Sequence, residues 1–451
     1  MGQGVGLSLA QLTDSALQHN LAIRSARHDI DAAREQRREA FTKYFPTVSG
    51  TVLTFNANRG MAKMDIDPGS MIPSSMAASL AQMLPAEMLA GLASPISMSM
   101  MKNGSIASLM AMQPVFAGGQ IVNGNRLARV GEDVSRLQLS LKENEVERQV
   151  AEYYWQLVSL EEKQRTLDAV DALLADICKD VEVAVRAGVA LRNDLLQVQL
   201  RQNDMESQRL KLQNAREVLS LITAQYCGLR TLPQPLPTRE GSIYSQGEES
   251  LEGLSTPLPV RERLRVGEQS SGMGQGVGLL PEYQLLEKQV EASRLQQKMT
   301  VGQQLPTVAV GAGYNYHNLL DNDRTFAMVF ATVSVPISDW WGGSHAIKRR
   351  KIAVRQAEEQ LADNAQLLTI RMQKAQNDVD EARQQLRLAQ RSIEQTEENL
   401  RLNRDRYRAG TCTMSDLLEA QLLHQQAHDK LTDAYADLQL RLLDLRQATG
   451  Q

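Results

Sequence analysis

The strongest constraint on this fold is an internal duplication with a constant spacing. The segment RAGVALRNDLLQVQL at 186–200 matches RAGTCTMSDLLEAQL at 408–422, so matched residues lie 222 positions apart. The same spacing relates Pro114 in QPVFAGG to Pro336 in VPISDWWGG. Because the spacing holds over more than a hundred residues, the two halves of the chain are predicted to be structural repeats.

A second pair of matched segments, nearer the start of each copy, shows where the first copy has extra residues. The segment FPTV at 45–48 matches LPTV at 305–308 with an offset of 260, so the first copy has 38 more residues between Val48 and Pro114 than the second has between Val308 and Pro336. The excess falls in a Met-, Ser- and Pro-rich stretch at 61–102, whose composition predicts a long loop.

These offsets predict the domain organisation. A first repeat at 1–228 and a second repeat at 280–451 are expected to form one elongated domain together. Between them, 229–279 is rich in Pro, Gly and Ser and is predicted to be a disordered or loosely attached insertion.

Each repeat contains the same order of helical and strand patterns. A helix is predicted over 8–42, ending before Pro46, and alternating strands follow it in both repeats. Extended helical patterns come next, and the one at 344–408 contains neither Pro nor Gly, which predicts a helix roughly 100 Å long. Stripes of Leu, Ile, Val and Ala predict coiled-coil packing with returning helices at about 192–227 and 414–449.

The strand patterns predict two hairpins per chain. An isolated hairpin is marginal in water, and strands of about 12 residues fit the length of a membrane β-strand. Four strands cannot close a barrel, and open sheet edges are not tolerated in lipid. Several copies of the chain would therefore have to pool their strands.

Composition excludes several classes of function. The net charge of −4 gives no basic surface, so nucleic acid is not an expected partner. The three cysteines have no metal or disulfide spacing, and no nucleophile triad or phosphate-binding loop is present, so we expect no enzyme, no metal and no cofactor. No run of 18 apolar residues predicts a membrane helix, and no signal peptide is visible in this chain.

Both repeats have the same order of elements. The order is a helix, (F/L)PTV, a hairpin, P-x-F-x-G-G or its counterpart, a long helix, an RAG turn and a D-L-L-x-x-Q helix. This order resembles the TolC family of outer-membrane channels. The resemblance implies a mainly α fold with a small β part, in which duplicated long antiparallel helices form an α-barrel. Two hairpins per chain then contribute four strands to a trimeric, twelve-stranded transmembrane β-barrel.

The resemblance also implies a function and partners. The homotrimer would lie in the outer-membrane lipid and extend into the periplasm, where it meets a periplasmic adaptor (membrane fusion) protein and an inner-membrane transporter. It would conduct substrates passively in a tripartite efflux pump or a type I secretion system. The alternative is a periplasmic coiled-coil adaptor or scaffold protein, although an adaptor is expected to carry a lipoyl-like β module that is not seen here.

The helix turns at Gly188 and Gly410 form the periplasmic tip in the family, so they mark the candidate aperture. Asp416 and Glu419 are spaced i, i+3 and share one helix face, so three copies would give two acidic rings that favour cations. Both match the family's acidic constriction. The resemblance further matches Tyr407 to a gating tyrosine, and Asp194 with Asn193 to its polar partner in the other helix pair.

Two alternatives apply to this aperture. Thr413-x-x-Asp416 is a capping-box pattern, so Asp416 has a structural role available to it. Where the family places an arginine between the tyrosine and the acidic pair, this chain has a cysteine. The residues concerned are Cys412 and the arginines that could replace the missing one, namely Arg192, Arg406 and Arg408.

Two further features concern the membrane end. Trp340 and Trp341 lie where a strand would leave the bilayer, as interfacial aromatics do, or else they pack at a strand-to-helix joint. Eleven of the eighteen methionines lie at 61–112, which would suit Cu(I) but is better explained as flexible apolar filler, because no His or Cys accompanies them.

Overall fold

A computed structural model describes residues 6–58, 62–66, 76, 96–100, 103–229, 234–235, 277–319, 322–337 and 339–450 of the chain. The chain divides into two compact units. We call them the helical unit (Met1–Glu35, Arg129–Ala292 and Val354–Gln451) and the strand unit (Gln36–Ala128 and Ser293–Ala353). The fold is mainly helical, with one four-stranded antiparallel sheet, as the sequence predicted.

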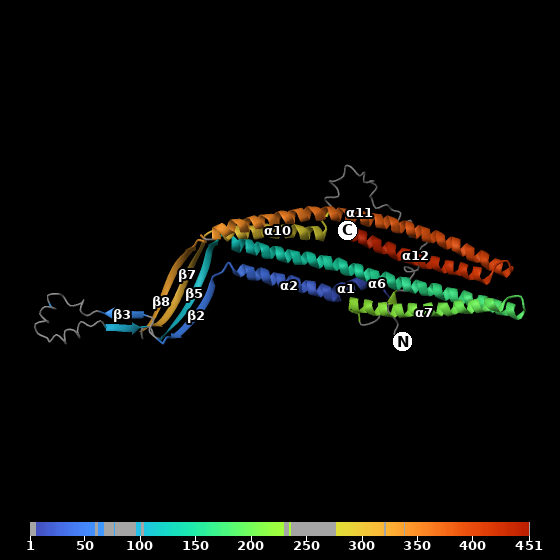
Figure 1. The fold of residues 1–451 in the computed structure, drawn as a ribbon, viewed down its shortest axis with the longest axis horizontal. Helices are drawn as coiled ribbons and strands as arrows, with labels where there is room; N and C mark the ends of the chain where they lie inside the picture. The colour runs from blue at the N-terminus through green and yellow to red at the C-terminus, as the bar shows by residue number, and fades with distance from the viewer. Residues whose placement is uncertain are drawn as a thin grey trace, which may run out of the picture. The chain divides into compact units, whose positions relative to one another are not determined.

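The helices of the second half follow the same order as those of the first, except that α1 has no counterpart among the described residues (Figure 1). Those of the first half are α1 (Leu9–His19), α2 (Leu21–Thr42), α6 (Gln120–Arg186) and α7 (Arg192–Cys227). Those of the second half are α10 (Pro281–Gly302), α11 (Asp339–Arg408) and α12 (Met414–Thr449). Helix α10 begins and ends 260 positions after α2, and α12 begins and ends 222 positions after α7. The domain boundaries at 228 and 280 stay a prediction.

The helix predicted over 8–42 is two helices, so that prediction is wrong in one respect. Asn20 separates α1 from α2 with φ −61° and ψ 135°, a conformation outside the helical region. Its Oδ1 accepts a hydrogen bond from the Ala22 amide at 2.8 Å, and its Nδ2 donates to the Tyr226 carbonyl at 3.0 Å. This side chain, which is 7% exposed, thus satisfies the backbone at the break and fixes α2 to α7.

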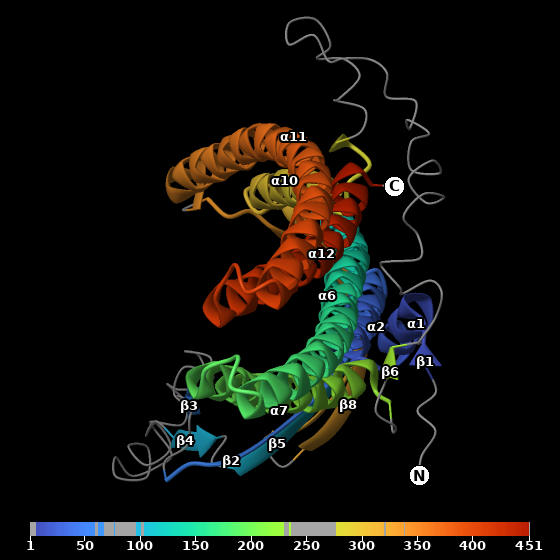
Figure 2. The same cartoon turned by 90° about the vertical axis from the view of Figure 1, so that its right-hand side faces the viewer.

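Within the helical unit, each long helix lies beside the helix that returns from it (Figures 1 and 2). Leu12, Ile23, Val146 and Cys227 form one buried cluster that holds α1 and α2 against α6 and α7. Burial of each such large aliphatic side chain contributes about 1.5–3 kcal/mol. Burial also raises the pKa of the Cys227 thiol to about 11, which makes it a packing residue and not a reactive one.

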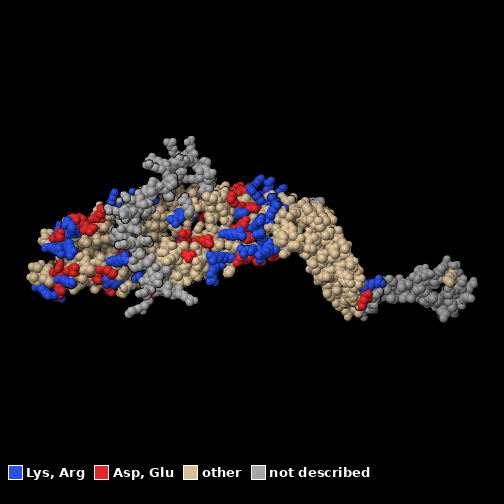
Figure 3. All heavy atoms as spheres, turned by 180° about the vertical axis from the view of Figure 1, so that it is seen from behind, with Lys and Arg blue, Asp and Glu red and all other residues tan. Residues whose placement is uncertain are grey.

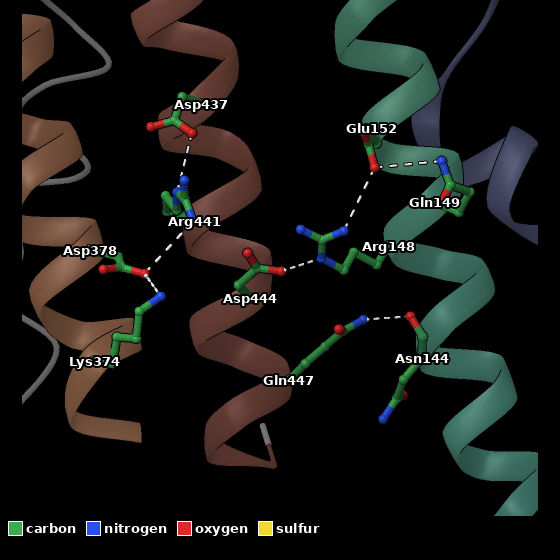
Figure 4. A network of polar contacts seen from close by, with 10 residues as sticks. All are labelled: Asn144, Arg148, Gln149, Glu152, Lys374, Asp378, Asp437, Arg441, Asp444 and Gln447. Atoms are coloured by element: carbon green, nitrogen blue, oxygen red, sulfur yellow. Dashed lines mark hydrogen bonds and ion pairs between the residues drawn. The ribbon is translucent and has the colours of Figure 1, made fainter. Parts of the chain in front are cut away.

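A polar network ties α12 to both long helices of the same unit (Figure 4). Arg148 of α6 forms an ion pair with Asp444 of α12 at 2.8 Å, and the Gln447 side chain donates to the Asn144 carbonyl at 2.9 Å. On the other side, Asp378 of α11 accepts Lys374 at 3.1 Å and lies 3.7 Å from Arg441 of α12. Helix α12 therefore holds the helices of the two halves together through polar contacts as well as apolar ones.

The sheet has the strand order β2-β5-β7-β8, with all neighbours antiparallel. The strands are β2 (Thr47–Asn56), β5 (Asn103–Ala117), β7 (Thr307–Leu319) and β8 (Asn322–Ser334). Thr47 pairs with Met112 in the first hairpin, and the residues 260 and 222 positions later, Thr307 and Ser334, pair in the second. The duplication therefore extends to the hydrogen-bond register of the hairpins.

The loop predicted at 61–102 contains secondary structure. Strands β3 (Ala62–Ile66) and β4 (Ile96–Met100) pair antiparallel, which gives the first hairpin an extension that the second lacks. Most of the rest of this stretch, including the proposed methionine role at 61–112, lies outside the described residues. In the insertion 229–279, β6 (Gln234–Pro235) pairs in parallel with β1 (Gly6–Leu7). At its other end Val277 is buried in a cluster with Leu280 and Leu368, so this end is packed and not loosely attached, and most of the remaining insertion lies outside the described residues.

No helix in the described part of the chain is long and apolar enough to cross a membrane.

Candidate functional site

The sheet has one apolar face. Side chains alternate along a strand, and residues paired across antiparallel strands point to the same face, so the register assigns each residue to a face. Small or apolar residues and tyrosine make up most of one face, which we call the apolar face: Val48, Val52, Ala107, Leu109, Ala111, Val310, Ala312, Tyr314, Ala327, Val329, Ala331 and Val333. Gln113, which pairs with Val310 near the end of β5, is a polar residue on the same face. No other part of the described chain covers it, since Val52, Tyr314 and Val329 are exposed.

The opposite face is mixed, with polar and apolar side chains in similar numbers. It carries Thr47, Ser49, Thr51, Ser108, Asn315, His317 and Thr332 among small and bulky residues such as Gly311, Met328 and Phe330. The two formally charged residues of the four strands are Asp323 and Arg324, both at the hairpin end of β8. In Figure 3 the strands accordingly form an uncharged surface, whereas the helices carry many charges.

The strands have the length and the open edges of a membrane sheet. At about 3.4 Å per residue a 13-residue strand is about 44 Å long, and tilted by about 45° it spans about 31 Å, more than the apolar band of about 25 Å that outer-membrane barrels present to lipid. Strands β2 and β8 each pair with one neighbour, so each leaves one edge unpaired among the described strands. An uncovered apolar face with two open edges is a surface that needs further strands and a lipid environment.

The two helix turns in the helical unit share one geometry. Gly188 follows α6 with φ +74°, and Gly410 follows α11 with φ +71°. The Val189 amide donates to the Ala184 carbonyl, and the Thr411 amide donates to the Arg406 carbonyl, which completes the same C-terminal cap in each turn. A side chain at either glycine would meet no atom within 4 Å, so glycine is needed for the backbone conformation and not for space.

Asp416 and Asp194 occupy the same position in the first turns of α12 and α7. Asp416 Oδ2 accepts from the Thr413 amide at 2.9 Å and from the Thr413 hydroxyl at 2.8 Å, and the Thr413 hydroxyl accepts from the Asp416 amide. The hydrogen bond from the Thr413 amide has the largest effect in lowering the pKa of Asp416, and the hydrogen bond from the Thr413 hydroxyl lowers it further. Asp194 accepts from the Leu191 amide at 3.2 Å. Both aspartates are thus helix caps, which is the structural role that the sequence left open for Asp416.

The other predicted aperture residues lie around these caps. Tyr407 packs at the edge of a cluster that contains Val181 and Leu417. Burial raises the pKa of its hydroxyl, and the nearby carboxylate of Asp194 raises it further, so the end of α11 and the start of α7 are close together. Glu419 and Asn193 are exposed, and the described residues form no hydrogen bond or ion pair with Glu419 that would neutralise it.

Cross-links between the two helix pairs come from residues that the sequence did not single out as gate residues. Arg201 of α7 donates to Gln421 at 3.3 Å and to Gln425 at 3.2 Å, both on α12. The Gln425 amide donates in turn to Gln208 of α7 at 3.1 Å. Burial lowers the pKa of Arg201, whose partners here are neutral amides. Gln421 is only 1% exposed, and its Nε2 has no acceptor among the described residues, so this link is buried and incompletely satisfied.

Cys412 does not take part in a latch with Asp194. Its thiol donates to the Asn403 carbonyl at 3.4 Å, and burial raises its pKa. Of the three candidate arginines, Arg406 is the one whose charge lowers the pKa of Asp416. Near these turns Arg201 joins α7 to α12, and the signal for this link was the glutamine at position 421, which the repeat alignment had already matched.

The tryptophans lie at the start of α11, shortly after β8 ends. Trp341 is 87% exposed, so the residues described do not bury it as a joint-packing residue. The side chain of Trp340 lies outside the described residues. No group of three or more His, Cys, Asp or Glu side chains in the described ranges could hold a metal ion as it stands.

Comparisons with known proteins agree with this architecture. Solved structures that share the fold include CusC (TM-score 0.76, 14% identity, 99% of this chain and 92% of that chain) and VceC from Vibrio cholerae (TM-score 0.70, 14% identity, 98% and 96%). The Campylobacter jejuni CmeC outer membrane channel also shares it (TM-score 0.72, 13% identity, 98% and 85%). No curated protein sequence matches the chain significantly.

The fold is thus that of the outer-membrane channels. Residues 281–451 match the family model described as outer membrane efflux protein, which is a family of channel proteins and not of enzymes. The resemblance to the TolC family that the duplicated motifs indicated is therefore confirmed.

Proposed function

We propose that this protein is the outer-membrane channel of a tripartite efflux pump or a type I secretion system. The observation that carries the proposal is the sheet, whose uncovered apolar face, uncharged middle and two open edges suit a strand set within lipid. Three copies that pair β8 with β2 would close a twelve-stranded barrel, with the mixed face lining the pore.

The helical unit supplies the rest of the conduit in this proposal. Its helices would form the periplasmic α-barrel, and its turns at Gly188 and Gly410 would meet a periplasmic adaptor and an inner-membrane transporter. The resemblance to the family and the match over residues 281–451 support these partners. Transport would be passive, since the chemistry and energy would come from the transporter.

Asp416 and Glu419 would form acidic rings at the aperture. Capping does not compete with this role, because the hydrogen bonds from Thr413 keep Asp416 ionised and Asp416 remains exposed. Glu419, also exposed, lies one turn further along the same helix face. Each ring of three carboxylates would concentrate cations and repel anions.

Two experiments test the proposal. Membrane fractionation is expected to give a detergent-requiring, heat-modifiable trimer, and a salt-soluble monomer would contradict the channel and favour a periplasmic scaffold. In planar bilayers, Asp416→Asn combined with Glu419→Gln should reduce cation selectivity, while the amide oxygen of the introduced asparagine keeps an acceptor for the cap. Glu394→Gln, an exposed acid on α11, is the control. Unchanged selectivity in the double variant would contradict the acidic rings.

A further inference from the structure

Two histidines face each other on α12, further along this helix than the proposed aperture residues. His424 and His428 are one helical turn apart, and their Nε2 atoms are separated by 3.2 Å. The ring centroids are 4.5 Å apart with an interplanar angle of 66°. The two Nε2 atoms are therefore close enough for one ion to contact both.

This separation fits two ligands of one metal ion. Two histidine nitrogens at about 2.0–2.1 Å from a tetrahedral Zn²⁺ lie about 3.3–3.4 Å apart. The observed 3.2 Å differs from that by about 0.1–0.2 Å, a difference that a small rotation of either ring removes. The same distance also allows a simple hydrogen bond between two neutral rings, so further features must distinguish the two.

The surroundings favour neutral rings with a carboxylate at hand. Both histidines are about half-buried, and burial lowers the pKa of each, which favours the neutral form that metal ions bind. The carboxylate of Glu397 on α11 is the group that opposes this shift at both rings. Glu397 is itself exposed, so its side chain is free to turn toward a bound cation.

We propose that His424 and His428 bind a divalent transition-metal ion of the zinc type, with Glu397 and water completing the coordination. The ion would join α12 to α11 ten residues, or about 15 Å, beyond the start of α12. It would stiffen this helix pair close to the turns. The proposal does not depend on the conduction function, since it concerns binding to the folded chain.

The test is a calorimetric titration with Zn²⁺ alone, on the untagged full-length protein in detergent after treatment with chelator. We expect one Zn²⁺ per chain at pH 7.5, with affinity at least tenfold weaker in His424→Gln and in His428→Gln. Glu397→Gln should weaken binding by a smaller factor, and His28→Gln, at an exposed histidine of α2, should leave it unchanged. Lowering the pH to 5.5 should weaken binding, because protonated rings cannot bind the ion.

A second measurement does not depend on the variants. Co²⁺ added to the wild-type protein should give the visible absorption of a low-symmetry, nitrogen-ligated ion, and Zn²⁺ should displace it. Absence of Zn²⁺ binding by the wild-type protein, or equal affinity of the wild type and both histidine variants, would overturn the proposal and leave the pair as a hydrogen-bonded contact.

Discussion

Val329 offers a direct measurement of which face of the sheet meets lipid. It is the eighth of thirteen residues in β8, lies on the apolar face opposite Ala312 and is 86% exposed. An arginine at the middle of a lipid-facing strand costs about 2–4 kcal/mol. Since about 1.4 kcal/mol is a factor of ten, Val329→Arg should lower the ratio of folded to unfolded protein by about 30-fold to 700-fold per chain.

The assay is urea unfolding of the protein folded into lipid vesicles, followed by heat modifiability on gels. Met328→Arg is the matched control, because Met328 precedes Val329 on the same strand and lies on the mixed face. An arginine there would point into the pore in the proposed barrel, so we expect it to cost less than about 1 kcal/mol. Equal effects of the two substitutions, or no effect of Val329→Arg, would refute the assignment of the apolar face to lipid.

Other predictions concern the caps and the joints. Thr413→Ala should destabilise the start of α12 by about 1 kcal/mol, measured as faster amide hydrogen exchange in its first turns. The folded state lowers the pKa of Asp416, so the stabilisation by its ionised carboxylate is complete above the unfolded pKa of about 4 and is lost as the pH falls through the folded value. The difference in melting temperature between wild type and Thr413→Ala should therefore shrink below about pH 4. Gly118→Ala should lower the melting temperature sharply, since φ is +59° and a Cβ would overlap the backbone of Gly302. Gly131→Ala, in an open helical position of α6, should be neutral or stabilising by up to about 1 kcal/mol, and similar losses at both glycines would contradict the steric argument.

Much of the helical architecture could be predicted from the sequence, because long tracts without Pro or Gly and the fixed offsets specify helices and their ends. The break at Asn20 could not. Apolar residues continue at helical spacing on both sides of it, and asparagine is only a weak helix breaker. What fixes the break is the Tyr226 carbonyl, 206 positions away, and such a partner is visible only when the chain is folded.

The candidate aperture was predictable to a similar degree. The cap at Asp416 follows from a local pattern, so the sequence contains it. The link from Arg201 to Gln421 depends on the register of two helices whose residues lie 220 positions apart, and no local pattern specifies that register. The sequence did not predict the pairing of β3 with β4 either, because a Met-, Ser- and Pro-rich composition predicts a loop and contains no signal for the pairing of its two ends.

The shared register of the two hairpins has a consequence for assembly. Within one chain, the second strand of the first hairpin pairs with the first strand of the second, with Ala111 opposite Ala312. Moving those two residues by the same offsets, 222 forward and 260 back, gives Val333 on β8 and Val52 on β2, both on the apolar face. A neighbouring copy that repeats the internal rule would therefore place its Val52 opposite Val333, and cysteines at these two positions would form a bond only between copies. The strand pairing between the two hairpins of one chain therefore already specifies the pairing between neighbouring chains.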